Sequence, residues 1–175
     1  MNMSKNKVFL FILFSMIFIM GCGEKLPEGM PPLFPVSIHI AYEDGSPISN
    51  ALLSFKPESG PRNWSVAATT DAEGNAKVRT HGRYIGMPTG NWKIVVQKEL
   101  LEGIAFPGTP DPNDPEGVKA YDEWKKSPNK QKTFSLVEEK YRNASSTPLQ
   151  IKVEGKGSFE FKAGKPCKIK LPDLM

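Results

Sequence analysis

The stretch VSIHIAYEDGSPISNALLSFKP, residues 36–57, decides the fold of this 175-residue chain. Apolar residues alternate with small or polar ones over residues 36–42, which is typical of a strand with one buried face. Residues 43–47, EDGSP, form a strong turn signal because glycine and proline interrupt regular structure. Alternation then returns over residues 50–56. This stretch therefore predicts two half-buried strands joined by a turn.

The same signature recurs along the chain. Further alternating segments lie at residues 65–70, 76–80, 91–98, 149–154, 159–161 and 167–171. The strand at residues 91–98 places Trp92, Ile94 and Val96 on one face, so these three side chains are expected in the core. No helix is expected between successive strands, which disfavours a parallel sheet. The pattern predicts an all-β fold: an antiparallel, immunoglobulin-like sandwich of seven to eight strands.

Residues 99–147 interrupt this pattern. The segment 107–115 is rich in proline, and residues 116–126 have the composition of a short helix. We expect a long loop with one short helix, inserted into the sandwich.

The N-terminus has the parts of an export signal. Lys5 and Lys7 form a positive region, and Val8 to Met20 is an apolar run of 13 residues. A helix that crosses a bilayer needs about 20 apolar residues, so this run is too short. The run leads directly into Gly21 and Cys22.

The segment Ile19-Met20-Gly21-Cys22 resembles the lipobox of bacterial lipoproteins. That resemblance implies that residues 1–21 are removed, that Cys22 carries lipid, and that residues 22–35 tether a domain of residues 36–175. It also implies the cell envelope, and Gly23 favours an outer membrane over an inner one. Two or more acyl chains hold a protein stably at a membrane. A transmembrane anchor and an ordinary secretory peptide are the alternatives.

Three segments, at residues 43–57, 70–76 and 88–96, carry a family resemblance. In order they contain an EDGSP turn leading into LSFKP, the turn TDAEGNA, and the strand PTGNWKIVV. Together they resemble the carboxypeptidase regulatory-like domains. The resemblance implies a transthyretin-like sandwich, and a structural, adhesion or accessory module without a common reaction.

No catalytic constellation stands out in the sequence. The two histidines, His39 and His81, lie at an outer strand face and at a strand end, and no GxSxG motif is present. Lysines and arginines are spread along the chain, which disfavours nucleic acid as a partner. We therefore expect no enzyme, no cofactor and no nucleic-acid ligand.

A metal site has only weak candidates. Asp111, Asn113, Asp114 and Glu116 offer oxygen ligands of the kind that calcium prefers, although prolines break the expected order. The favoured interpretation is a polar loop in which Asp114 caps the following helix. Zinc is not expected, since no CxxC or HExxH motif is present.

Three further side chains leave alternatives open. Tyr121 and Trp124 share one face of the expected helix, which either docks the insertion on the sandwich or forms a partner surface. Cys167 shares parity with Ile169 and Leu171, so it is either a small buried residue or a reactive thiol.

The sequence thus favours a membrane-anchored, non-catalytic lipoprotein of the cell envelope, which acts as a structural module or as a binding module for a protein or an envelope polymer. The alternatives are an enzyme, or a ligand- or calcium-binding protein, with its site in residues 99–147. An assembly subunit that uses an exposed edge strand is a third hypothesis.

Overall fold

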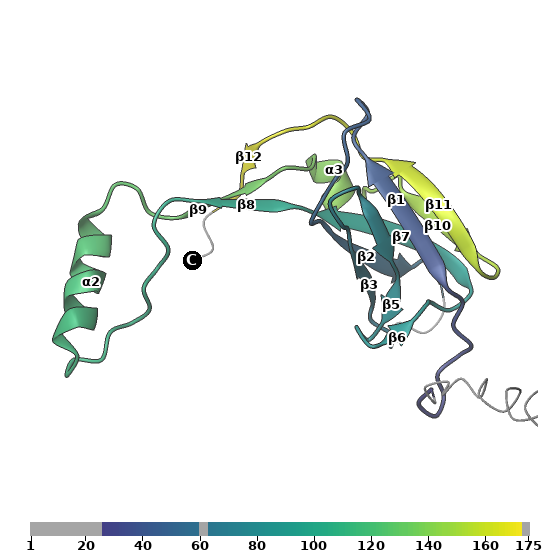
Figure 1. Cartoon of the computed structure of the whole chain (residues 1–175), viewed down its shortest axis with the longest axis horizontal. Helices are drawn as coiled ribbons and strands as arrows, with labels where there is room; N and C mark the ends of the chain where they lie inside the picture. Colours follow the sequence, from purple (N-terminus) through teal and green to yellow (C-terminus); the bar gives the residue numbers. More distant parts are fainter. Residues whose placement is uncertain (1–25, 60–62, 173–175) are drawn as a thin grey trace, which may run out of the picture. The chain divides into compact units, whose positions relative to one another are not determined.

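A computed structural model describes residues 26–59 and 63–172 (Figure 1). The chain divides into two units, residues 1–30 and residues 31–175. In the first unit the described residues form a turn, in which the amide of Met30 donates to the carbonyl of Pro27 at 3.1 Å. The second unit carries the regular structure and is described by itself below.

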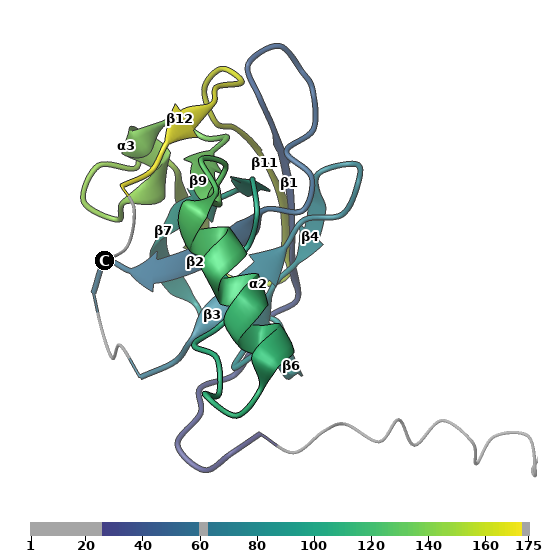
Figure 2. The same ribbon diagram turned by 90° about the vertical axis from the view of Figure 1, so that its left-hand side faces the viewer.

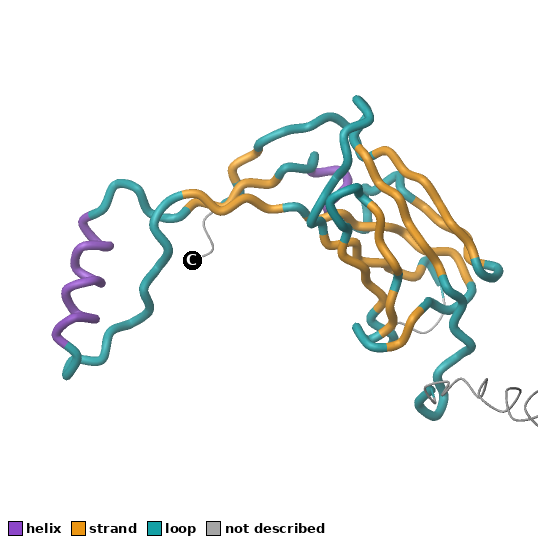
Figure 3. Tube along the Cα trace, viewed as in Figure 1, coloured by secondary structure: helices purple, strands orange, loops and turns teal. Residues whose placement is uncertain are grey.

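Strands dominate the second unit, as the orange segments in Figure 3 show. In chain order the elements are β1 (Val36–Ala41), β2 (Leu52–Pro57), β3 (Val66–Thr69), β4 (Asn75–Lys77), β5 (Arg79–Thr80), β6 (Tyr84–Ile85), β7 (Gly90–Gln97), β8 (Glu99–Glu102), α2 (Pro115–Lys126), β9 (Lys132–Ser135), α3 (Glu139–Arg142), β10 (Gln150–Val153), β11 (Gly157–Lys162) and β12 (Ile169–Lys170).

Two sheets pack face to face around one core. The larger has the order β10-β7-β2-β3-β5-β6 and is antiparallel throughout, and the smaller has the order β11-β1-β4. The largest fully buried side chains come from both sheets and include Ile38, Ile40, Leu53, Phe55 and Ile94. An all-β sandwich is therefore confirmed, because the alternating strands bury their apolar faces against each other.

The predicted core residues of β7 are buried. Trp92, Ile94 and Val96 all belong to the core cluster, as the two-residue period requires. The indole N–H of Trp92 is buried without a hydrogen-bond partner among the described residues.

Antiparallel pairing throughout the sandwich was a wrong expectation. β1 pairs with β11 in parallel, with Val36 opposite Gly157 and Ala41 opposite Lys162. The residues 154–156 cross from one sheet to the other instead of closing a hairpin between β10 and β11. A crossing between the two layers gives a parallel neighbour without a helix, so the absence of crossover helices did not exclude it.

The predicted strand at residues 76–80 is divided between the two sheets. β4 pairs with β1, whereas β5 pairs with β3. The switch occurs at Val78, which is fully buried and whose amide donates to the carbonyl of Val36 at 3.0 Å. One corner of the sandwich is therefore closed by a single chain segment.

A third sheet, of order β12-β9-β8, leaves the sandwich (Figure 1). A single residue, Lys98, separates β8 from the end of β7, and α2 lies beyond the β8–β9 hairpin (Figures 1 and 2). We call residues 99–135 the arm. The helix predicted at residues 116–126 is confirmed, since α2 spans Pro115–Lys126. The β8–β9 hairpin was not predicted, because the adjacent Leu100 and Leu101 of β8 break the alternation that indicates a strand. The short helix α3 was not predicted either.

The C-terminal strand differs from the prediction. β12 covers only Ile169 and Lys170, and it pairs with β9 of the arm. Ile169 is 41 % exposed, and Cys167 is only half-buried and lies outside the strand. The expected inward face of residues 167–171 is therefore wrong, because this segment joins an uncovered sheet.

Candidate functional site

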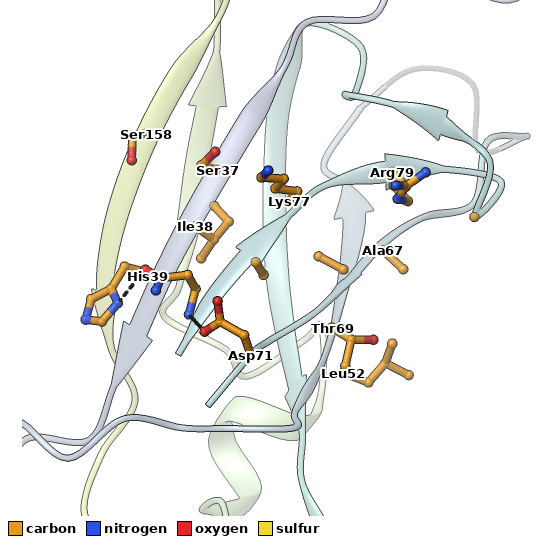
Figure 4. A pocket seen from close by; sticks show the side chains of 14 residues that line it. Ser37, Ile38, His39, Leu52, Ala67, Thr69, Asp71, Lys77, Arg79 and Ser158 are labelled. Carbon is orange, nitrogen blue, oxygen red and sulfur yellow. Dashed lines mark hydrogen bonds between the residues drawn. The ribbon is translucent and has the colours of Figure 1, made fainter. Parts of the chain in front are cut away.

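A groove of about 690 Å³ lies at the corner where β4 leads into β5 (Figure 4). We call it the corner groove. Its floor includes Ile38, Ala67 and Ala68, and its polar rim includes the following side chains: Ser37, His39, Asp71, Lys77, Arg79 and Ser158. The rim comes from both sandwich sheets, because the chain changes sheets at this corner.

Strand register places the polar groups in rows. Across the smaller sheet, His39 lies opposite Asn75 on one side and Glu160 on the other. A ring nitrogen of His39, Nδ1, is hydrogen-bonded to Oδ1 of Asn75 at 3.1 Å. The next row contains Ser158, Ser37 and Lys77.

The turn before β4 ends at Asn75, the residue that contacts His39, and it is stabilised by Asp71. The carboxylate of Asp71 accepts hydrogen bonds from the amides of Glu73 at 3.0 Å and Asn75 at 2.8 Å. Gly74 has a φ of 80°, a left-handed conformation that glycine adopts readily. A turn is present at residues 71–75 as expected, but the expectation of a hairpin there was wrong, because the turn joins two sheets and not two paired strands.

The groove is suited to binding a polar ligand. Lys77 and Arg79 are exposed cations, and the guanidinium of Arg79 donates to the carbonyl of Arg83 at 3.1 Å. Within the described residues, the side-chain hydrogen bond of His39 goes to an amide and not to a serine hydroxyl. The arrangement therefore offers hydrogen bonds and positive charge around an apolar floor.

Tyr121 and Trp124 form an aromatic cluster with Phe106. The rings of Tyr121 and Trp124 stack at an angle of 23° and a centroid distance of 6.1 Å. Phe106 meets both rings edge-on, at 6.1 Å and 4.9 Å. The indole N–H of Trp124 donates to the carbonyl of Ile104 at 3.3 Å. All of these contacts lie within the arm.

Tyr121 and Trp124 therefore do not dock the helix on the sandwich. α2 has no buried residue, and it packs on the loop that precedes it. Lys130 lies over the ring of Trp124 at 4.8 Å, and Lys125 lies over the ring of Tyr121 at 5.4 Å. The cluster remains partly exposed, and Phe106 is 51 % exposed.

The four calcium candidates lie in the loop and first turn at the N-terminus of α2, where they form local hydrogen bonds. Asp111 accepts hydrogen bonds from the backbone and side-chain amides of Asn113, at 2.9 and 3.1 Å. Asp114 is the N-cap residue, and its carboxylate accepts from the amide of Glu116 at 3.2 Å. The cap predicted at Asp114 is thus confirmed. Among the described residues, no group of three or more acidic, histidine or cysteine side chains is placed to hold a metal ion.

Of the two cysteines, only Cys167 lies within the described residues. Cys22 and Gly23 lie outside the described residues. Burial, with a contribution from Glu138, raises the pKa of the Cys167 thiol, while Arg142 opposes the shift. Since the thiolate is the reactive form, a raised pKa counts against a reactive thiol at Cys167. None of the helices in the described ranges is both long and apolar enough to cross a bilayer.

Sequence reasoning missed the corner groove. The alternation did place Ser37 and His39 on the outer parity of β1, but nothing local shows that β4 and β11 flank this strand. Models of known protein families, curated proteins and solved structures give no match to this chain.

Proposed function

We propose that this protein is a lipid-anchored, non-catalytic binding module of the bacterial cell envelope, whose arm contacts a protein or an envelope polymer. The aromatic cluster of the arm carries the proposal. Phe106, Tyr121 and Trp124 pack against each other, yet α2 buries none of its residues. Aromatic side chains that remain accessible on a projecting element are typical of binding surfaces.

We also propose a transthyretin-like sandwich of seven to eight main strands. Within the described residues, the sandwich strands of three residues or more are β1, β2, β3, β4, β7, β10 and β11. The family resemblance supports the proposal through its turn at residues 43–47, where Asp44 accepts from the amide and hydroxyl of Ser46 at 2.9 and 2.6 Å.

The anchor is proposed on the sequence of residues 5–22. Removal of residues 1–21 leaves Cys22 at the new N-terminus, where palmitate or a similar acyl chain is attached. Growth with an alkyne-tagged fatty acid tests this anchor. We expect the full chain to take up the label, Cys22→Ala to lose it, and Cys167→Ala to keep it. Two free thiols in the mature protein contradict the lipidation.

The binding role is tested by sedimentation with purified cell-wall polymer and by crosslinking in intact envelopes. Because aromatic anchors dominate binding free energy, we expect Trp124→Ala and Phe106→Ala each to weaken retention about tenfold. Ile85→Ala is the matched control, since Ile85 is 61 % exposed and lies on β6, outside the arm. Equal retention of all variants, in both assays, contradicts an arm-centred function.

The second candidate is a calcium-binding protein or enzyme with its site in residues 99–147. The polar loop at residues 111–116 is the observation behind it. Calcium should then slow amide exchange at the start of α2 in the full chain, and Asp114→Ala should abolish this effect of calcium. Amide exchange unaffected by calcium leaves the cap as the role of Asp114.

A further inference from the structure

A second pocket, of about 840 Å³, lies on the outer face of the larger sheet. Its volume falls within the range of small-molecule sites. Ser54, Lys56 and Lys93 line it from β2 and β7, while Trp64 and His81 line it from the segments that flank β3 and β5. We call it the Trp64 pocket.

Two lysines meet in this pocket. Lys56 and Lys93 are direct cross-strand partners in the antiparallel pair of β2 and β7. Side chains at such positions lie about 5 Å apart at Cβ, and like charges there destabilise a sheet. Neither lysine forms an ion pair or a side-chain hydrogen bond within residues 26–59 and 63–172. An anion between the two ammonium groups would remove this repulsion.

Partial burial strengthens the interaction with an anion. Lys93 is half-buried, whereas Lys56 is exposed. A charge that has lost part of its water interacts more strongly with an opposite charge. Glu58 also lines the pocket, so the two lysines and Glu58 together contribute a net charge of about +1. This balance fits a ligand with one negative charge.

An aromatic wall stands beside the lysines. The rings of Trp64 and His81 meet edge-on, at 5.4 Å and 68°. His81 has a φ of 53°, a left-handed conformation that a non-glycine residue adopts at a cost in free energy. The amide of His81 donates to the carbonyl of Ser65 at 2.7 Å, which fixes this conformation. The backbone of His81 is thus fixed where its ring contacts Trp64.

The remaining lining groups are hydroxyls. Ser54, Ser65 and Ser145 all line the pocket and can both donate and accept hydrogen bonds. A ligand that matches the whole lining has a carboxylate, several hydroxyl groups and a ring with an apolar face for Trp64.

We propose that the Trp64 pocket binds an acidic sugar unit, with its carboxylate between Lys56 and Lys93 and its ring against Trp64. The pocket belongs to the sandwich and not to the arm, so this site goes beyond the proposed function and does not depend on it.

Calorimetry on the full chain in detergent tests the proposal with three probes: glucuronate, glucose and acetate. We expect glucuronate to bind about tenfold more tightly than glucose or acetate, because only glucuronate combines the charge with the ring. Binding should weaken with added salt. Equal binding of glucuronate and glucose, or no binding of glucuronate at all, overturns the proposal.

Variants separate the two halves of the site. Lys56→Gln and Lys93→Gln should each weaken glucuronate binding about fivefold to tenfold, since each removes one charge-assisted hydrogen bond. Trp64→Ala should weaken glucuronate but leave acetate unchanged. Lys152→Gln is the control, because Lys152 pairs with Glu154 and does not line the pocket. Wild-type affinity in both lysine variants contradicts the assigned site.

The melting temperature gives a second test of the lysine pair, which does not require a measured dissociation constant. Without ligand, Lys56→Gln should raise the melting temperature, because it removes the like-charge contact with Lys93. Saturating glucuronate should raise the melting temperature of the unmodified chain more than that of this variant. A variant that melts lower without ligand, and gains as much from glucuronate, contradicts the role of the lysine pair.

Discussion

At the scale of single residues, Gly74 lies in the turn that connects β3 of the larger sheet to β4 of the smaller sheet. The amide of Ile40 donates to the carbonyl of Gly74 at 2.9 Å, and a Cβ at residue 74 would overlap the carbonyl oxygen of Ile40. We expect Gly74→Ala to lower the free energy of unfolding by about 2–3 kcal/mol, from backbone strain and overlap together.

The control for Gly74 is Gly45. Gly45 has a φ of 88°, but no atom lies within 4 Å of a Cβ built there. Gly45→Ala should therefore cost only the strain, about 1 kcal/mol. Urea unfolding measures both variants, and equal costs would show that the approach to Ile40 is not tight.

Glu138 gives the fold an acid-sensitive contact. The amide of Lys165 donates to the carboxylate of Glu138 at 3.0 Å, and this bond, helped by Lys140, lowers the pKa of Glu138 below its ordinary value of 4.5. A lowered folded pKa contributes stability that is present above about pH 4.5 and is lost as the pH falls through the folded pKa. Glu138→Gln should therefore reduce the loss of melting temperature between neutral and acidic pH. An unchanged pH profile contradicts this contact.

At the scale of elements, α2 depends on its own cap. Asp114 accepts from the amide of Glu116, and Pro115 occupies the first turn. Because α2 buries no residue, Asp114→Ala should cost the helix about 1 kcal/mol without changing the melting of the sandwich. Amide exchange within residues 115–126 measures the effect, and Asp114→Asn is the control that keeps a capping oxygen. Equal exchange in the alanine variant would mean that the cap does not stabilise α2.

The elements also show where sequence reasoning succeeds. Residues 36–42, 50–56 and 91–98 alternate strongly, and each forms a strand of the expected face, because burial of one face imposes a period of two. Turn signals also placed Gly74 and the cap at Asp114 correctly.

Pairing is what the local pattern does not contain. Residues 155–157, Gly-Lys-Gly, have the composition of a tight hairpin turn, yet β10 pairs with β7 and β11 with β1. The choice of partner depends on which apolar faces close the core together, and that depends on the whole chain. The rows of the corner groove and the Lys56–Lys93 pair follow from pairing, so neither was predictable from single segments.

At the scale of the whole second unit, the arm is separable from the core. Apart from Ser135 at its end, the buried residues lie outside residues 99–135 within the described chain. Glu102 and Lys132 are direct partners at the end of the hairpin, a spacing that a two-residue turn can bridge. We expect replacement of residues 103–131 by Asn-Gly to change the melting temperature by no more than about 3 °C.

The same deletion should abolish retention by the arm's partner while leaving glucuronate binding in the Trp64 pocket intact. Circular dichroism measures the melting temperature, sedimentation measures retention, and calorimetry measures glucuronate binding, all on one preparation. An unfolded product would show instead that the arm is required for the sandwich to form.

The junction between β7 and β8 has a mechanical consequence. A single residue, Lys98, separates the two strands, so the part of a pull on the arm that passes through β8 is delivered to β7 at its C-terminal end. β7 lies between β2 and β10, and their hydrogen bonds run across the strand direction. A load along β7 therefore shears many bonds at once instead of opening them one by one. In the proposed lipid-anchored module, tension between the anchor and a partner bound to the arm would therefore load the sandwich in shear, the direction in which a sheet resists separation best.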